Sequence, residues 1–136
     1  MNVEDIYNIN LLSFNVRGLR METKRISIFQ YIIRKKIDIC FLQETHSKEC
    51  DENKWRNEWG GEMYFSHGTS QARGVSVLFR SGFDMKVLDI KIDKDGRYLY
   101  MNIESQDTNF KIINIYAPNI DINQLRFFYK YKEIIG

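Results

Sequence analysis

The most constraining feature of the sequence is a short run, residues 37–42 (IDICFL), that is apolar on both faces. The segment before it, residues 23–36, places apolar side chains at i, i+3 and i+7 from Ile26, while lysines and arginines crowd the opposite face. A mostly apolar strand over residues 10–16 comes first. A strand, an amphipathic helix and a strand buried on both faces are typical of parallel strands joined by a crossover helix. The sequence therefore predicts an α/β fold.

The middle of the chain is rich in predicted strands separated by turn residues. They cover the ranges 62–66, 74–80, 85–92, 97–104 and 109–116. The turn Asp-Lys-Asp-Gly at 93–96 predicts a hairpin between the third and fourth of these strands. Residues 109–116 are mostly apolar on both faces, which predicts a central strand. A short helix is expected around Trp55 and Trp59, and a second amphipathic helix over residues 121–135.

Composition is that of an ordinary globular protein with one small core. The 136 residues are 43% hydrophobic and 28% charged, and the net charge of +2 is compatible with nucleic acid without arguing for it. Cys40 lies in an apolar run and Cys50 in a polar stretch, and two unpaired cysteines fit a reducing, intracellular setting. No apolar run approaches the roughly 20 residues of a membrane span, so no membrane partner is expected.

Three polar residues stand where predicted strands give way to loops. Asn15 is near the end of the first strand, Glu44 follows the second, and Tyr116 ends the last. Loops at strand ends in layered α/β folds converge on one edge of a sheet, where ligands bind. A lone carboxylate at such an edge suits Mg²⁺, which keeps several waters, and an amide and a phenol suit phosphate oxygens.

Each of the three residues also has a simpler interpretation. An Asn beside Gly18 is more often a turn residue than a site residue. A lone Glu after a strand is usually a solvated loop residue or a cap, and a Tyr before Ala-Pro is usually a packed ring with its hydroxyl at the surface. Spacing alone leaves these alternatives open.

Five segments, in order along the chain, resemble motifs of the endonuclease/exonuclease/phosphatase superfamily. They are residues 13–19 (SFNVRGL), 42–46 (LQETH), 74–79 (GVSVLF), 93–98 (DKDGRY) and 114–119 (NIYAPN). The last two resemble in particular the versions found in the endonucleases of LINE-type retrotransposons. The resemblance implies part of a DNase-I-like, four-layer α/β/β/α sandwich. It also implies that residues 1–136 form a single domain that is incomplete at its C-terminal end.

The resemblance implies roles for individual residues. Glu44 would hold a divalent cation, Mg²⁺ or Mn²⁺, and Asn15 would belong to the hydrogen-bond network beside it. Tyr116 would hydrogen-bond the scissile phosphate of DNA, and Asn119 is a weaker candidate for a contact to the DNA backbone. Arg17 would meet phosphates electrostatically, unless it belongs only to a solvated face. The same two interpretations apply to the cations that follow it, Arg20, Lys24 and Arg25.

The mechanism of the family needs residues that this sequence does not contain. An aspartate from a Gly-Asp-x-Asn motif activates the water, and a C-terminal Ser-Asp-His motif supplies an Asp–His pair; neither motif occurs here. His46 and His67 are interpreted as loop residues rather than substitutes for the catalytic histidine. We therefore expect little or no DNA hydrolysis by this chain, and exposed apolar surface where the rest of the fold would pack.

The leading interpretation is a DNA-nicking endonuclease domain from a retrotransposon open reading frame. Such a protein would act in the nucleus if the element is eukaryotic, and in full length it would include the missing half of the domain and a reverse-transcriptase domain. One alternative is another branch of the superfamily, a phosphoinositide phosphatase or sphingomyelinase. A second is a degenerate domain that only binds nucleic acid or a protein partner. Salt-dependent DNA binding without metal-dependent cleavage would favour the second alternative.

Overall fold

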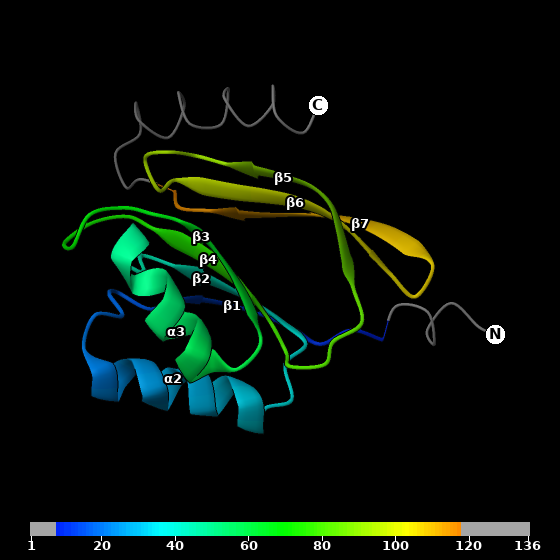
Figure 1. Cartoon of the computed structure of the whole chain (residues 1–136), viewed down its shortest axis with the longest axis horizontal. Coiled ribbons are helices and arrows are strands. Elements are labelled where there is room, and N and C mark those ends of the chain that lie inside the picture. Colours follow the sequence, from blue (N-terminus) through cyan, green and yellow to red (C-terminus); the bar gives the residue numbers. More distant parts are fainter. Residues whose placement is uncertain (1–7, 118–136) are drawn as a thin grey trace.

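The computed structural model describes residues 8–117 and shows three layers, with two sheets face to face and two helices on the outer side of the first sheet (Figure 1). The first sheet has the order β1 (Leu11–Asn15), β2 (Ile39–Gln43), β4 (Val75–Phe79), β3 (Glu62–Ser66). The second has the order β5 (Lys86–Ile92), β6 (Tyr98–Ser105), β7 (Thr108–Ile115). The helices are α2 (Glu22–Arg34), the 3₁₀ turn η1 (Glu49–Asp51) and α3 (Glu52–Trp59).

These layers are the α/β/β part of the predicted α/β/β/α sandwich. The helix predicted over residues 121–135 lies outside the described residues, as does Asn119. No helix among residues 8–117 is long and apolar enough to cross a membrane.

The predicted strand–helix–strand unit is confirmed: β1 and β2 are parallel, with Asn15 beside Gln43 in the register. Helix α2 ends two residues before the predicted position. Lys36 adopts a left-handed conformation with φ 55°, and the N–H of Ile37 bonds to the carbonyl of Ile32, which closes the helix end. Arg34 in the last turn complements the helix dipole.

Strand β2 separates two apolar cores because its side chains alternate between the two faces of the sheet. Cys40 and Leu42 pack beneath the helices, while Ile39 and Phe41 face the second sheet. The first core also contains two tryptophans of α3, Trp55 and Trp59. The second core lies between the sheets and is built from buried residues of β2, β4 and β6.

The hairpin predicted around residues 93–96 is confirmed, since β5 and β6 are antiparallel and flank this turn. The prediction that residues 109–116 form a central strand is wrong for the part of the chain that the structure describes. β7 pairs with β6 alone among residues 8–117 and is therefore the last strand of its sheet. On one face of β7, Phe110 and Ile112 pack against the core between the two sheets.

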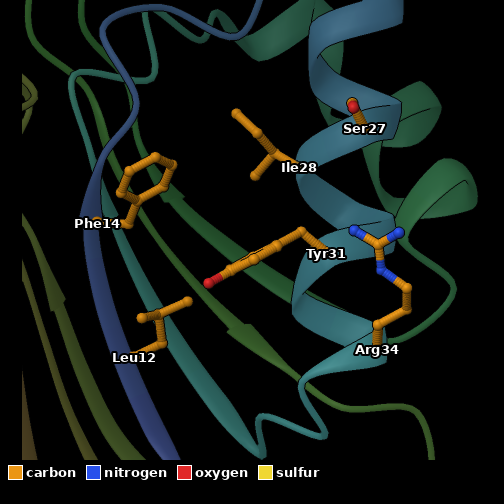
Figure 2. Close-up of a pocket in the computed structure, with 6 residues that line it drawn as sticks. All are labelled: Leu12, Phe14, Ser27, Ile28, Tyr31 and Arg34. Carbon is orange, nitrogen blue, oxygen red and sulfur yellow. The ribbon is translucent and has the colours of Figure 1, made fainter.

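The opposite end of the first sheet is open and partly apolar. No strand among the described residues pairs with the free edge of β1, whose Leu11 and Phe14 are 58% and 45% exposed. A hollow of about 380 Å³ lies between β1 and α2, where Leu12, Phe14, Ile28 and Tyr31 point toward one another (Figure 2). Apolar surface is therefore exposed at this edge of the first sheet.

The two cysteines are expected to differ sharply in reactivity. Burial raises the pKa of the Cys40 thiol to about 12, whereas Cys50 is exposed. Titration with an aromatic disulfide at pH 8 should therefore detect one thiol in the native protein and two after unfolding.

The same shift predicts an alkaline loss of stability. In the unfolded chain Cys40 ionises near its ordinary pKa of 9.0, while in the folded protein it stays protonated. The unfolded state then binds fewer protons, so the free energy of unfolding should fall as pH rises from about 9 towards 12. Cys40→Ala should flatten this slope in denaturant titrations, and two thiols of equal reactivity in the native state would contradict the argument.

Candidate active site

The loops that follow β1 and β2 are joined by main-chain hydrogen bonds. The N–H of Gly18 donates to the carbonyl of Glu44 over 2.6 Å, and the N–H of Leu19 donates to the carbonyl of Thr45 over 3.0 Å. Because β1 and β2 are parallel, both loops leave the same edge of the sheet. Main-chain hydrogen bonds thus hold together the first two motif segments, residues 13–19 and 42–46.

The other three motifs join this edge in the same way. The N–H of Thr45 donates to the carbonyl of Gly74 over 3.0 Å, and the N–H of Gly74 donates to that of Gly96 over 2.9 Å. The N–H of Tyr116 donates to the carbonyl of Arg97 over 2.8 Å. All five motif segments therefore meet at one edge through a row of main-chain hydrogen bonds, which we call the loop row (residues 16–19, 44–46, 73–74, 96–97 and 116).

Several residues of the loop row have a left-handed backbone although they are not glycine. Arg17, Glu44, His46 and Arg73 have φ between 52° and 60°. Such conformations cost roughly 1–3 kcal/mol each and persist only where the surrounding structure holds them. At Gly74, with φ 90°, a side chain is excluded outright, because an added Cβ would lie 2.5 Å from Oγ1 of Thr45.

Asn15 is the last residue of β1 and is exposed. Its Oδ1 accepts a hydrogen bond of 3.1 Å from the N–H of Arg17, a local turn that helps to set the left-handed conformation there. The turn-residue interpretation of Asn15 is therefore confirmed. Its amide nitrogen has no hydrogen-bond partner among the described residues, so that group is available to a ligand at the edge of the sheet.

Glu44 lies directly after β2 and is half-buried. Within residues 8–117 its carboxylate makes no hydrogen bond or ion pair, and no group of three or more His, Cys, Asp or Glu side chains gathers around a possible ion. One free carboxylate fits Mg²⁺ or Mn²⁺ as a single protein ligand with water filling the other positions. It does not by itself form a closed metal cage.

The pKa of His46 depends on its burial and on the charged groups around the carboxylate of Glu44. Partial burial lowers the pKa of its imidazole; the charge of Glu44 opposes that shift, and those of Lys24 and Arg20 add to it. Glu44 thus shares its surroundings with cations. The ring lies against Gly18, where an added Cβ would come within 2.9 Å of Nδ1. Its place in the loop row agrees with the interpretation of His46 as a loop residue.

The four cations after the first motif have different surroundings. Arg17 is exposed, and Nζ of Lys24 donates to its carbonyl. Arg20 is bound to Asp51 at 2.6 Å. Both sequence-based interpretations are wrong for Arg25. This residue is buried and binds both carboxylate oxygens of Glu58 at 2.8 Å. It is therefore neither solvated nor free to meet a phosphate. Arg17 is thus the best placed of the four for an anion.

Tyr116 lies just past β7 rather than in it. Its ring is half-buried and packs against the apolar core between the sheets, in agreement with the packed-ring interpretation. Its main chain belongs to the loop row through Arg97.

Sequence reasoning missed Asn114, which joins the two sheets beside the candidate site. Its Nδ2 donates to the carbonyls of Leu42 and Ser76 at 2.9 and 2.8 Å, and its Oδ1 accepts from Nε2 of Gln43 at 2.8 Å. The side chain is 2% exposed. The one available signal was an amide inside an otherwise apolar strand. This residue fixes the end of β7, and hence Tyr116, relative to the end of β2 and Glu44.

Known proteins share this fold and part of this sequence. The chain is 28% identical to the "Transposon TX1 uncharacterized 149 kDa protein" of Xenopus laevis over 88% of this chain and 9% of that protein. It is 23% identical to an exodeoxyribonuclease of Bacillus subtilis, over 82% of this chain and 43% of that one. It thus spans less than half the length of either curated relative.

Solved structures match almost the whole described fold. An AP endonuclease from Archaeoglobus fulgidus has a TM-score of 0.66 at 20% identity, covering 92% of this chain and 48% of that one. TDP2 from Caenorhabditis elegans has a TM-score of 0.68 at 18% identity, covering 99% of this chain and 45% of that one. A model of the endonuclease/exonuclease/phosphatase family matches residues 12–132. The chain therefore belongs to the endonuclease/exonuclease/phosphatase family.

Proposed function

We propose that this chain is the first part of a Mg²⁺- or Mn²⁺-dependent DNA endonuclease domain from a LINE-type retrotransposon. The observation that carries the proposal is the loop row, which gathers five motif segments around the unpaired carboxylate of Glu44. The transposon relative of 149 kDa supports a longer protein, which would include the rest of the domain and a reverse-transcriptase domain. In a eukaryotic host its work would be in the nucleus, on DNA.

In this proposal each residue has a defined part. Glu44 holds the cation, which when bound would neutralise charge on the scissile phosphate. Asn15 and Tyr116 offer an amide and a phenol that would donate to phosphate oxygens. Arg17, with no side-chain partner among residues 8–117, adds positive charge that favours the DNA backbone. Asn119, beyond the described residues, would contact the backbone further along.

The chain lacks the two motifs whose residues would activate water in the family. No Asp is followed by His, and no Gly-Asp-x-Asn motif occurs in the 136 residues. General acid–base assistance contributes roughly 10²–10⁴-fold, and removing several cooperating groups costs more than removing one. Residues 1–136 would thus be a single domain incomplete at its C-terminal end, able to bind metal and DNA but a poor hydrolase.

The test combines metal binding with cleavage. Mn²⁺ binding, followed by electron paramagnetic resonance, should weaken at least about tenfold in Glu44→Gln. It should stay unchanged in Glu104→Gln, which alters an exposed carboxylate on β6. With Mg²⁺ and supercoiled plasmid, the purified chain should nick no faster than Glu44→Gln.

Two results would contradict parts of the proposal. Equal Mn²⁺ affinity in wild type and Glu44→Gln would remove Glu44 from the metal site. Robust nicking that depends on Glu44 would keep the endonuclease but refute the inactivity of the isolated chain. DNA binding that weakens with salt, without any metal binding, would favour the degenerate nucleic-acid-binding alternative.

A further inference from the structure

A line of side-chain hydrogen bonds leads from the Glu44 loop into the protein. Oγ1 of Thr45 lies 3.3 Å from Oγ of Ser47, and that oxygen lies 2.9 Å from Nδ1 of His67. On the other side of the ring, Nε2 lies 2.6 Å from Oε2 of Glu52. Thr45 and Ser47 are fully buried. We call these four residues the hydroxyl–imidazole line.

The chemistry of the groups assigns one direction to the protons. An ionised Glu52 only accepts, so Nε2 of His67 carries the hydrogen and donates it. In the neutral imidazole Nδ1 has a lone pair, which accepts from the hydroxyl of Ser47. Ser47 in turn accepts from the hydroxyl of Thr45. Every donor has an acceptor, so the line is satisfied along its whole length without a water.

The set resembles the residue types of a nucleophilic triad, but its geometry rules that function out. Ser47 is 0% exposed, so no substrate reaches its hydroxyl. Its place in the fold gives it a structural meaning instead: Ser47 connects the Glu44 loop to a histidine 20 residues further along the chain.

The far end of the hydroxyl–imidazole line is firmly anchored. Glu52 opens α3 and also binds Arg56 at 3.1 Å, one turn further along. Nε of Arg56 donates to the carbonyl of Met63 in β3 over 3.0 Å. The ring of His67 stacks on Phe65 with a centroid distance of 5.2 Å. A helix and a strand therefore fix the imidazole from two sides.

The near end is the part of the candidate site that needs support. Glu44 has φ 56° and His46 φ 58°, conformations that most side chains avoid. Thr45, between them, is held by one main-chain bond to Gly74, by another from Leu19, and by the hydroxyl–imidazole line. Losing the line would leave a strained loop held by its main-chain hydrogen bonds and by the bond from Arg20 to the carbonyl of His46.

We propose that His67 is a positioning residue for Glu44. Through Ser47 and Thr45 it holds the loop in the left-handed conformation that directs the carboxylate to the edge of the sheet. The inference rests on the proposed function, because it assumes that Glu44 binds the metal. His67 itself touches neither the metal nor the substrate.

Two matched substitutions separate the two bonds of the imidazole. In His67→Asn the amide oxygen falls near the position of Nδ1 and still accepts from Ser47, while the bond to Glu52 is lost. In His67→Gln the longer side chain reaches Glu52 but no longer meets Ser47. Ser47→Ala removes the same link from the other side. Ile103→Val, in the core of the second sheet, serves as a control that lowers stability far from the loop.

The first measurement is amide hydrogen exchange of Thr45 and His46 in the full chain, which needs no metal. We expect exchange at least about tenfold faster in His67→Gln and Ser47→Ala, and near wild-type rates in His67→Asn and Ile103→Val. The second is Mn²⁺ affinity, expected to fall about tenfold in the first two variants only. Equal exchange rates in His67→Gln and His67→Asn would overturn the proposal, as would an effect that merely follows thermal stability.

The two readouts keep this inference separate from the proposed function. If wild type binds no Mn²⁺, the metal proposal fails, and the exchange rates alone decide whether His67 holds the loop. If Glu44 binds Mn²⁺ but His67→Gln binds it equally well, the positioning role fails while the metal site stands.

Discussion

The Asn114→Ala variant is expected to unfold about 2–4 kcal/mol more easily than wild type, because two buried carbonyls lose their side-chain donor and the amide of Gln43 loses one of its acceptors. The lost bonds are those to Leu42, Ser76 and Gln43, all at 2.8–2.9 Å. They join the second sheet to the first, so the effect should exceed that of an ordinary polar truncation. Equilibrium denaturation in urea, read by tryptophan fluorescence, measures it.

A matched substitution in the neighbouring strand isolates the cause. Asn102 in β6 has a buried Oδ1 without a hydrogen-bond partner, so Asn102→Ala should change stability by less than about 1 kcal/mol. Asn114→Asp should be worse than Asn114→Ala, since it turns an oxygen towards the carbonyls of Leu42 and Ser76. Similar losses for Asn102→Ala and Asn114→Ala would show that the link between the sheets contributes little.

The Arg25→Ala variant is expected to lose about 3–5 kcal/mol, because it leaves the carboxylate of Glu58 largely buried without a counter-charge. The two side chains are 3% and 13% exposed and form two bonds of 2.8 Å. The guanidinium also donates to the carbonyls of Leu19 and Arg20 and lies over the ring of Trp55. Thermal and urea unfolding would measure the loss.

Two further variants show whether the unpaired charge is responsible. Arg25→Met combined with Glu58→Leu should be more stable than Arg25→Ala, since no buried charge remains. Arg56→Ala breaks a more exposed pair, with side chains 41% and 28% exposed, and should cost less than about 1 kcal/mol through that pair. If the double variant is as unstable as Arg25→Ala, the loss comes from packing and from the two carbonyls instead.

The first sheet could be predicted largely from the sequence because its signals are local. The apolar period of α2 and the apolar run in β2 each lie within a dozen residues, and they specify the parallel pair directly. The end of α2 was missed by two residues. Lys35 and Lys36 suit a helix C-terminus by charge, and only the backbone shows that Lys36 is already left-handed.

The strand ends at which the candidate residues stand could be predicted from the sequence, but the backbone conformation there could not. Asn15, Glu44 and Tyr116 each stand at or just after the end of a predicted apolar strand, and that pattern alone predicts one shared edge. The left-handed backbone of Glu44 was not predictable, because such a conformation normally signals itself through Gly or Asn.

Contacts between distant residues escaped prediction for a different reason. The ion pair of Arg25 could not be predicted, because its partner, Glu58, lies 33 residues away in the sequence. Asn114 and Gln43 are 71 residues apart, and His67 and Ser47 20. A single sequence shows that these side chains are polar but not which of them meet once two cores have formed.

The loop row has a consequence for how such a protein can change over evolutionary time. Its bonds join N–H and carbonyl groups, which every residue except proline supplies. Apart from glycines such as Gly74, where a Cβ does not fit, and from the left-handed positions, which most side chains avoid, exposed side chains along the row can change without loss of these bonds. The main-chain frame thus does not depend on those side chains, so a point substitution at this edge can alter the chemistry while the fold persists.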